Sequence, residues 1–198
     1  MNDETSLRRG RPRDPHLEQR VYDAVLEVYW ERGWSGFTLD AVARKATVGR
    51  AALYRRWASK GDLLVDALEA RSPLAEPIDL GTFRADLVEL AVQLLVGYRS
   101  TAGLVSLRVA LDARVHPDLL GHMMDTLNRS RLVAARSIVH RAQERGEAPK
   151  STDTTRILDL VTGAVLSHVI FSHRQVADQT AENDRVYAES MVDTVLSA

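Results

Sequence analysis

Cysteine is absent from the 198-residue chain. The sequence therefore excludes disulfide bonds, thiolate metal sites and thiol catalysis. It also lacks a continuous apolar run near the roughly 18 residues of a membrane-spanning helix, and its polar N-terminus has no hydrophobic signal segment. We therefore expect a cytoplasmic protein with no membrane partner. Its 45% hydrophobic and 27% charged residues are ordinary for a globular chain that buries a core.

An overall excess of either sign of charge is also lacking, because 26 Lys and Arg against 27 Asp and Glu leave a formal net charge of only −1. The distribution along the chain is uneven. Residues 8–60 contain 12 Lys and Arg against six Asp and Glu, whereas residues 61–198 contain 14 against 19. A basic module followed by an acidic one predicts that the first part binds a polyanion.

Hydrophobic spacing of about 3.6 residues recurs along the chain without period-two alternation, which predicts an all-α fold. We expect a flexible basic arm over 1–14, a small helical domain over 15–71 and a larger helical domain over 78–198. Ser72, Pro73, Glu76 and Pro77 mark the linker between them. The expected helices span 15–32, 38–46, 50–57, 60–70, 83–98, 102–115, 117–145 and 157–171, with a last one containing 187–196.

Residues 38–64 contain the most informative pattern. Thr38 is the expected N-cap of a short amphipathic helix, and residues 47–49 break its periodicity. A second helix then begins at Arg50 with Leu53 and Trp57 on its inner side. Residues 59–62 form an expected capping box before a third helix. This arrangement predicts a helix-turn-helix whose second helix enters a DNA major groove.

This segment resembles the DNA-binding domain of the tetracycline-repressor (TetR) family over about 17–70. Two departures concern the turn, where Thr47 replaces the usual Gly and Gly49 replaces the usual Ser N-cap, so the left-handed turn residue is either strained or displaced. The resemblance implies a ligand-responsive transcriptional regulator, by family habit a repressor. The matching positions are Phe37, Thr38, Leu39, Ala43, Val48, Leu53, Tyr54, Arg55, Arg56, Trp57, Ser59, Lys60 and Leu63.

Nine residues are predicted to contact double-stranded DNA. The resemblance implies phosphate contacts from Thr38, Tyr54 and Lys60, and the first of these also stands at a helix N-terminus suited to an anion. Arg50 is expected to read a guanine. The basic arm is expected to enter an A·T-rich minor groove, although a disordered solubilising tail explains it too. The predicted contacts are Thr38, Arg50, Ala51, Ala52, Tyr54, Arg55, Lys60, Arg9 and Arg11.

The resemblance also implies a pocket for a small-molecule effector between the helices of residues 83–145. Arg108 has two interpretations: it contacts an anionic ligand, or it pairs with Asp112 one turn later. Coupling to DNA is expected to pass through the helix of residues 60–70. The candidate pocket residues are Phe83, Leu87, Leu94, Tyr98, Leu104, Arg108, Leu111, Met123, Met124 and Leu127. The sequence does not identify the effector.

The segment 157–171 is apolar on almost every side, so both of its faces need cover. A second copy of the chain supplies that cover in a two-fold four-helix interface, whereas a fully central helix in a monomer is the alternative. The resemblance implies a homodimer too, and hence a palindromic operator. The candidate interface residues are Ile157, Val161, Gly163, Ala164, His168, Phe171, Tyr187, Met191 and Val195.

Two other classes of protein remain as alternatives. A small helical enzyme is disfavoured because the six histidines show no i, i+4 metal-binding pair and no glycine-rich phosphate loop occurs. We predict no catalytic residue, metal site or cofactor. A non-specific architectural DNA-binding protein would use the basic arm and face alone, and it predicts neither a preferred DNA sequence nor a response to a ligand.

Overall fold

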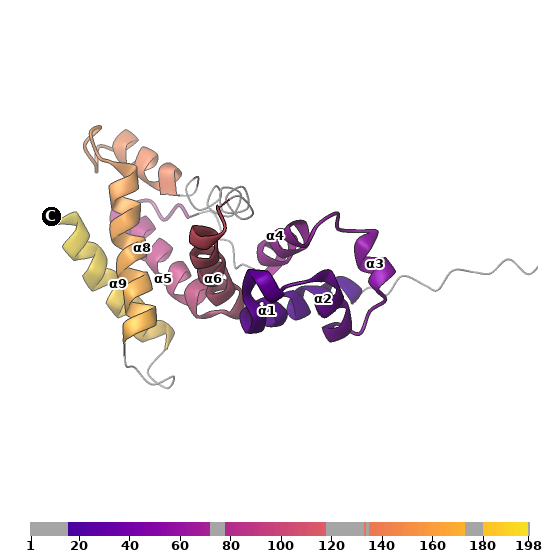
Figure 1. The fold of residues 1–198 in the computed structure, drawn as a ribbon. Helices are drawn as coiled ribbons and strands as arrows, with labels where there is room; N and C mark the ends of the chain where they lie inside the picture. The colour runs from indigo at the N-terminus through magenta and orange to yellow at the C-terminus, as the bar shows by residue number, and fades with distance from the viewer. Residues whose placement is uncertain (1–15, 72–77, 118–132, 134, 173–179, 198) are drawn as a thin grey trace, which may run out of the picture.

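The predicted all-α fold is confirmed by a computed structural model, which describes residues 16–71, 78–117, 133, 135–172 and 180–197. Throughout these ranges, helices are the only regular elements. In Figure 1, α3 lies at one end of the molecule, α8 and α9 lie at the other, and α6 lies between them. The predicted basic arm, with Arg9 and Arg11, lies outside the described residues, as do the linker 72–77 and Met123, Met124 and Leu127.

The helix bounds follow the sequence pattern with small changes. Of the predicted helix 117–145, residues 118–132 and 134 lie outside the described residues, and residues 135–144 are helical. The other helices are α1 (Leu17–Gly36), α2 (Leu39–Lys45), α3 (Arg50–Tyr54), α4 (Lys60–Arg71), α5 (Phe83–Arg99), α6 (Thr101–Val115), α8 (Thr154–Phe171) and α9 (Ala181–Leu196).

The predicted end of the first helix at residue 32 corresponds to a break within α1. The helix continues to Gly36, but Gly33 interrupts it with φ 61° and ψ −174°. A left-handed φ of this kind is accessible to glycine at little cost. The main chain therefore turns sharply before Trp34. Trp34 belongs to a short helical segment that follows the break at Gly33.

The first hydrophobic core joins α1–α4 to α6. Tyr29 of α1 is fully buried and packs edge-on against Phe37, with ring centroids 5.4 Å apart. Leu53 and Trp57 are buried here, as the sequence predicted. Val105 of α6 is also completely buried in this core. Thus α6 packs into the N-terminal unit although it follows α5 in sequence.

The corner between α5 and α6 fixes this placement. The two helices are bent by 84° relative to each other. Ser100 caps α6 by accepting a hydrogen bond from the Gly103 N–H at 3.0 Å. A Cβ at Gly103 would stand 2.0 Å from the Gly97 carbonyl oxygen, so the close approach of the two main chains requires glycine there.

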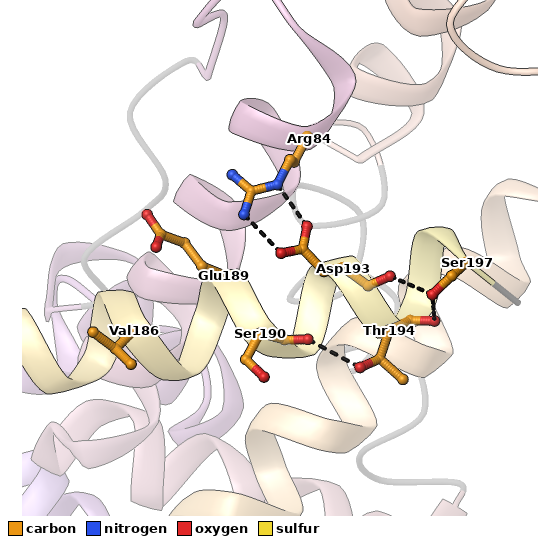
Figure 2. A pocket seen from close by; sticks show the side chains of 7 residues that line it. All are labelled: Arg84, Val186, Glu189, Ser190, Asp193, Thr194 and Ser197. Carbon is orange, nitrogen blue, oxygen red and sulfur yellow. Dashed lines mark hydrogen bonds and ion pairs between the residues drawn. The ribbon is translucent and has the colours of Figure 1, made fainter.

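The second core is formed by α5, the helix of residues 135–144, α8 and α9. Among the ion pairs that join α5 to α9, Arg99–Asp184 and Arg84–Asp193 lie at different depths. Arg99 reaches both carboxylate oxygens of Asp184, at 2.8 and 2.6 Å, and Asp184 is 5% exposed. Arg84 makes a two-pronged contact with Asp193 at 2.6 and 2.9 Å beside a surface pocket (Figure 2). The same chemistry therefore occurs once buried and once exposed.

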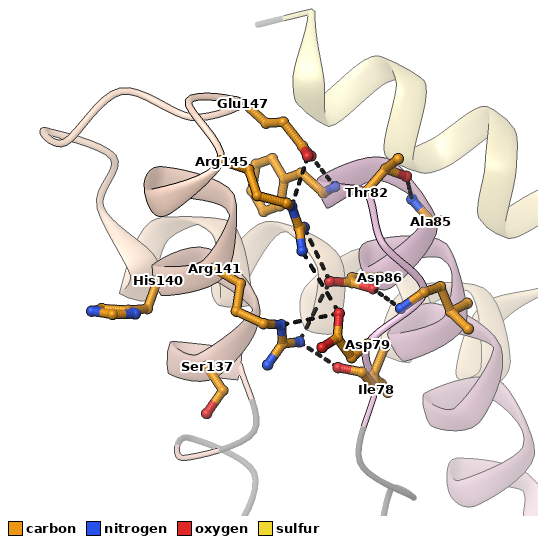
Figure 3. A network of polar contacts seen from close by, with 12 residues as sticks. Ile78, Asp79, Thr82, Ala85, Asp86, Ser137, His140, Arg141, Arg145 and Glu147 are labelled. Carbon is orange, nitrogen blue, oxygen red and sulfur yellow. Dashed lines mark hydrogen bonds and ion pairs between the residues drawn. The ribbon is translucent and has the colours of Figure 1, made fainter.

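A buried carboxylate joins the start of α5 to the helix of residues 135–144. Asp86 is completely buried and accepts a hydrogen bond from the Leu80 N–H at 2.6 Å. Arg141 and Arg145 converge on its other oxygen at 3.4 and 3.5 Å (Figure 3). Asp79 approaches the same two guanidinium groups. Buried charges are stable only when paired and hydrogen-bonded, so this network holds one relative position of the two helices.

Candidate nucleic-acid interface

Thr38 caps α2 as predicted. Its Oγ1 accepts a hydrogen bond from the Ala41 N–H at 3.1 Å, and the residue is exposed. The hydroxyl proton of Thr38 therefore remains available as a donor to a phosphate oxygen. Val42 is fully buried beneath this turn and holds α2 against the core.

The turn between α2 and α3 shows the strained alternative of the two predicted from its sequence. Thr47 has φ 56°, the left-handed conformation for which the family usually supplies glycine. A β-branched side chain in this conformation costs about 1–2 kcal/mol. Gly49 is the N-cap of α3, as predicted, with φ −69° and ψ 132°. The turn is therefore retained despite Thr47.

The regular part of α3 is shorter than the predicted segment 50–57, because it ends at Tyr54 and continues only as a turn through Arg55 and Arg56. Its outer surface carries Arg50 and Arg55, together with Tyr54, whose exposed fraction is 58%. Of the two predicted alanines, Ala51 is exposed and Ala52 is half-buried. Apart from Ala52, the predicted contacts of this helix are thus exposed.

Several of the basic side chains near α3 already form ion pairs with neighbouring carboxylates. Arg50 forms an ion pair with Asp40 of α2 at 3.1 Å. Arg56 pairs with Glu18 at 2.8 Å. Across the described part of the chain, Arg55 has no ion-pair partner. The count of positive charges therefore overstates the positive field near α3, and the contact of Arg55 with DNA remains a prediction.

Lys60 begins α4, but its ammonium group is held in place. Its Nζ donates to the Trp34 carbonyl oxygen at 2.7 Å and lies 4.0 Å from the centre of the Trp34 ring. Burial lowers the pKa of this lysine. The prediction of Lys60 as a phosphate contact did not include Trp34, because Lys60 and Trp34 are 26 positions apart in sequence.

The candidate effector residues do not share one environment. Phe83, Leu87 and Tyr98 are buried in the second core, and Leu94 packs against it. Leu104 is half-buried. Leu111, in contrast, is 71% exposed on α6. The effector pocket remains a prediction.

Arg108 does not form the predicted i, i+4 pair with Asp112. Its guanidinium instead donates to the Trp30 carbonyl oxygen of α1. Asp112 Oδ2 accepts from the Tyr29 hydroxyl at 2.8 Å and from the Trp34 N–H at 3.1 Å. Arg108 and Asp112 of α6 therefore both contact the end of α1, a long-range arrangement that helix periodicity could not reveal.

The candidate interface residues differ in how far their own protomer buries them. Val161 is completely buried within its own protomer, so its assignment to the dimer interface is corrected. His168 stacks on Tyr187 with ring centroids 3.8 Å apart, which joins α8 to α9. Ile157, Ala164, Met191 and Val195 are half-buried, whereas Gly163 is exposed.

The uncovered side of α8 also contains residues that the sequence did not single out. Leu160 is 44% exposed and Ile170 51% exposed, and the predicted Phe171 is 71% exposed. Only Val161 and Val165 of this helix are buried. The signal for Leu160 and Ile170 was present in the apolar composition of the segment, but periodicity could not tell which side the protomer itself covers.

The fold and the exposed face of α3 define a helix-turn-helix DNA-binding protein with a second, helical domain. Residues 21–67 match the family model "Bacterial regulatory proteins, tetR family", and residues 77–195 match "Tetracyclin repressor-like, C-terminal domain". The chain belongs to the TetR family, and it is a DNA-binding transcriptional regulator.

Relatives of similar length support this assignment. The chain is 33% identical to the HTH-type transcriptional regulator AqdR of Rhodococcus erythropolis, over 86% of this chain and 81% of that protein. It is 30% identical to the DNA-binding transcriptional repressor TetR of Mycobacteroides abscessus, over 73% and 76%. Salmonella enterica GusR has the same fold, with a TM-score of 0.69 at 15% identity over 96% of this chain and 100% of that one.

Proposed function

We propose that the protein acts as a homodimer that represses transcription by binding a palindromic operator, and that a small-molecule effector releases it. The observation that carries the DNA contact is the outward set of Arg50, Tyr54 and Arg55 on a helix anchored by buried Leu53. Repression is supported by the relative from Mycobacteroides abscessus, which is named a transcriptional repressor. Such a regulator works in the cytoplasm.

Selection of random duplex DNA by the purified protein at about 150 mM salt tests this function. We expect an enriched near-palindrome whose half-sites are about 34–36 Å apart, as two recognition helices require. Replacement Arg50→Ala should weaken binding to the enriched site by about 1–3 kcal/mol and relax the preference at one position in each half-site.

The control is Arg56→Ala, because Arg56 lies just beyond the end of α3 and pairs with Glu18 of α1. It should keep the preferred sequence. An enriched site that Arg50→Ala leaves unchanged would remove Arg50 from base recognition. If the wild-type protein enriches no sequence, the architectural function is favoured instead.

The proposed dimer is supported by the uncovered side of α8. This helix has a mean hydropathy of 1.3 over its 18 residues, yet only 11% of that window is buried. Its length and composition would also suit a membrane span, but helices of soluble proteins can have the same length and apolar composition. In a DNA-binding regulator, a second copy that covers Leu160, Ile170 and Phe171 is the simpler explanation.

Replacement Gly163→Arg should separate the dimer without unfolding the protomer. A Cβ at Gly163 meets no atom within 4 Å, so the protomer itself tolerates a side chain there. Sedimentation should change from twice the chain mass of 22.0 kDa to a single chain mass, with an unchanged helical circular dichroism spectrum. Ser137→Arg, at an exposed position of the helix 135–144, is the control and should remain dimeric. A dimeric Gly163→Arg variant would place the interface elsewhere.

The effector domain is proposed to be the unit around the second core. An effector there would favour a dimer geometry unsuited to the operator, and the predicted route passes through α4. The structure supports a second connection, since α6 contacts both α1 and α4. Because α6 lies between the two cores, a change in the packing of either core can displace this helix.

A further inference from the structure

The main-chain carbonyl and N–H groups of Trp34 both form hydrogen bonds to side chains of other helices. Its carbonyl oxygen accepts from Lys60 of α4 at 2.7 Å, and its N–H donates to Asp112 of α6 at 3.1 Å. Trp34 itself is 8% exposed. One buried residue therefore connects a predicted phosphate contact directly to a side chain of α6.

Two side chains of α6 with opposite charges, Arg108 and Asp112, contact the turn before Trp34. The guanidinium of Arg108 donates to the Trp30 carbonyl oxygen and packs against Gly33, where an added Cβ would lie 2.7 Å from its Nη2. The carboxylate of Asp112 binds the N–H on the other side of the same turn. Since Gly33 departs from helical geometry, this turn lacks part of the regular hydrogen bonding that would otherwise fix it.

A second donor keeps Asp112 oriented. The Tyr29 hydroxyl donates to the same carboxylate oxygen at 2.8 Å. Burial, reinforced by this hydrogen bond, raises the pKa of Tyr29, so the phenol stays protonated as a donor. Asp112 is thus fixed from two positions of α1.

The surroundings of Lys60 define where its ammonium group lies. The carbonyl that it binds belongs to Trp34, directly after the break in α1 at Gly33, and the indole face of Trp34 lies beneath the charge. An ammonium group has three N–H donors. One of them is used by Trp34, which leaves two for a phosphate oxygen.

We propose that Trp34 is a positioning residue that holds Lys60 for a DNA phosphate, and that Asp112 of α6 sets the position of Trp34. This inference rests on the proposed function, in which Lys60 contacts DNA. A displacement of α6 that withdraws Asp112 frees the Trp34 N–H, and the turn then no longer presents its carbonyl to Lys60. The DNA contact weakens although no residue of α3 has moved.

Operator affinity measured between 50 and 200 mM salt tests the proposal with Asp112→Ala, Lys60→Ala and the double variant. Each lost phosphate contact reduces the slope of log affinity against log salt by about 0.9, so a dimer loses about 1.8. We expect Asp112→Ala to lower the slope as Lys60→Ala does. The double variant should match Lys60→Ala alone, because both changes remove the same contact.

Two conservative variants separate positioning from stability. Asp112→Asn keeps an acceptor oxygen for the Trp34 N–H and should retain the wild-type slope. Tyr29→Phe removes the other donor to Asp112 and should retain it too. Asp112→Leu repeats the test with the volume of the side chain filled. If the salt slopes of Asp112→Ala and Lys60→Ala change additively, or if neither Asp112→Ala nor Asp112→Leu folds, Asp112 serves stability and the proposal is overturned.

The same experiment keeps this inference distinct from the proposed function. A wild-type protein that binds no preferred sequence refutes the function itself. Sequence-specific binding whose salt slope does not respond to Lys60→Ala refutes only the phosphate contact, and with it the positioning role of Trp34.

Discussion

Operator affinity is expected to fall by about 10³–10⁵ when salt rises from 50 to 200 mM. This range follows if the dimer neutralises roughly six to ten phosphates, because each neutralised phosphate releases condensed counterions. The predicted contacts Thr38 and Tyr54 are neutral donors, so the slope depends on the cationic residues. Among the described residues near α3, Arg55 and Lys60 are the strongest candidates.

Two adjacent arginines provide an internal comparison. Arg55 has no ion-pair partner within the described residues, whereas Arg56 pairs with Glu18 at 2.8 Å. We expect Arg55→Ala to reduce the salt slope of the dimer by about 1.8 and to weaken all operator sequences alike. Arg56→Ala should change the slope less, since its charge is already partly compensated. Fluorescence anisotropy with the selected operator at five or more salt concentrations measures both.

An equal loss of slope in the two variants would show that the ion pair with Glu18 opens on DNA. A slope that is nearly flat for the wild type would contradict the assignment of a phosphate-clamping interface. In that case the basic composition of residues 8–60 would serve solubility.

Replacement Arg99→Ala is expected to cost about 3 kcal/mol of folding free energy, the lower end for breaking a buried ion pair. The cause is the Asp184 carboxylate, whose side chain is 7% exposed and which would be left without its partner. For a chain of this size the cost corresponds to a fall in Tm of roughly 6–12 °C. Thermal unfolding followed by circular dichroism at fixed protein concentration measures it.

The exposed pair between the same two helices supplies the control. Arg84 and Asp193 keep side-chain exposures of 48% and 56% (Figure 2), so Arg84→Ala should unfold close to the wild-type temperature. A double variant Arg99→Met with Asp184→Leu should recover most of the loss, because no charge then remains buried. If the double variant is as unstable as Arg99→Ala, desolvation of Asp184 is not the cause.

Much of the DNA-binding unit followed from the sequence because its signals are local. Thr38 caps the helix that begins one residue later, and the capping box is closed by the Ser59 and Asp62 hydrogen bonds at 3.0 and 3.1 Å. The departure at Thr47 was visible because a threonine stands where the family usually has glycine, although the sequence left strain and displacement of the turn as alternatives. The burial of Leu53 and Trp57 followed from their spacing alone.

The effector and dimer regions were less predictable because several different environments suit an apolar helix. Val161 and Leu160 are neighbours of the same character, yet one is completely buried and the other is 44% exposed. Only the position of α5 and α9 against α8 decides which side the protomer covers. The sequence pattern of residues 157–171 therefore predicted an uncovered face but not all of its members.

The sequence by itself determined the all-helical class, the helix-turn-helix and the outward residues of α3, since caps, turns and helical periodicity act over a few residues. Only the tertiary structure decided which charges are paired and how α6 reaches α1. The Trp34–Asp112 hydrogen bond joins residues 78 positions apart, and Arg99 meets Asp184 across 85 positions. Contacts at such separations depend on how whole helices pack, and the α5–α6 corner at Gly103 sets that packing for α6.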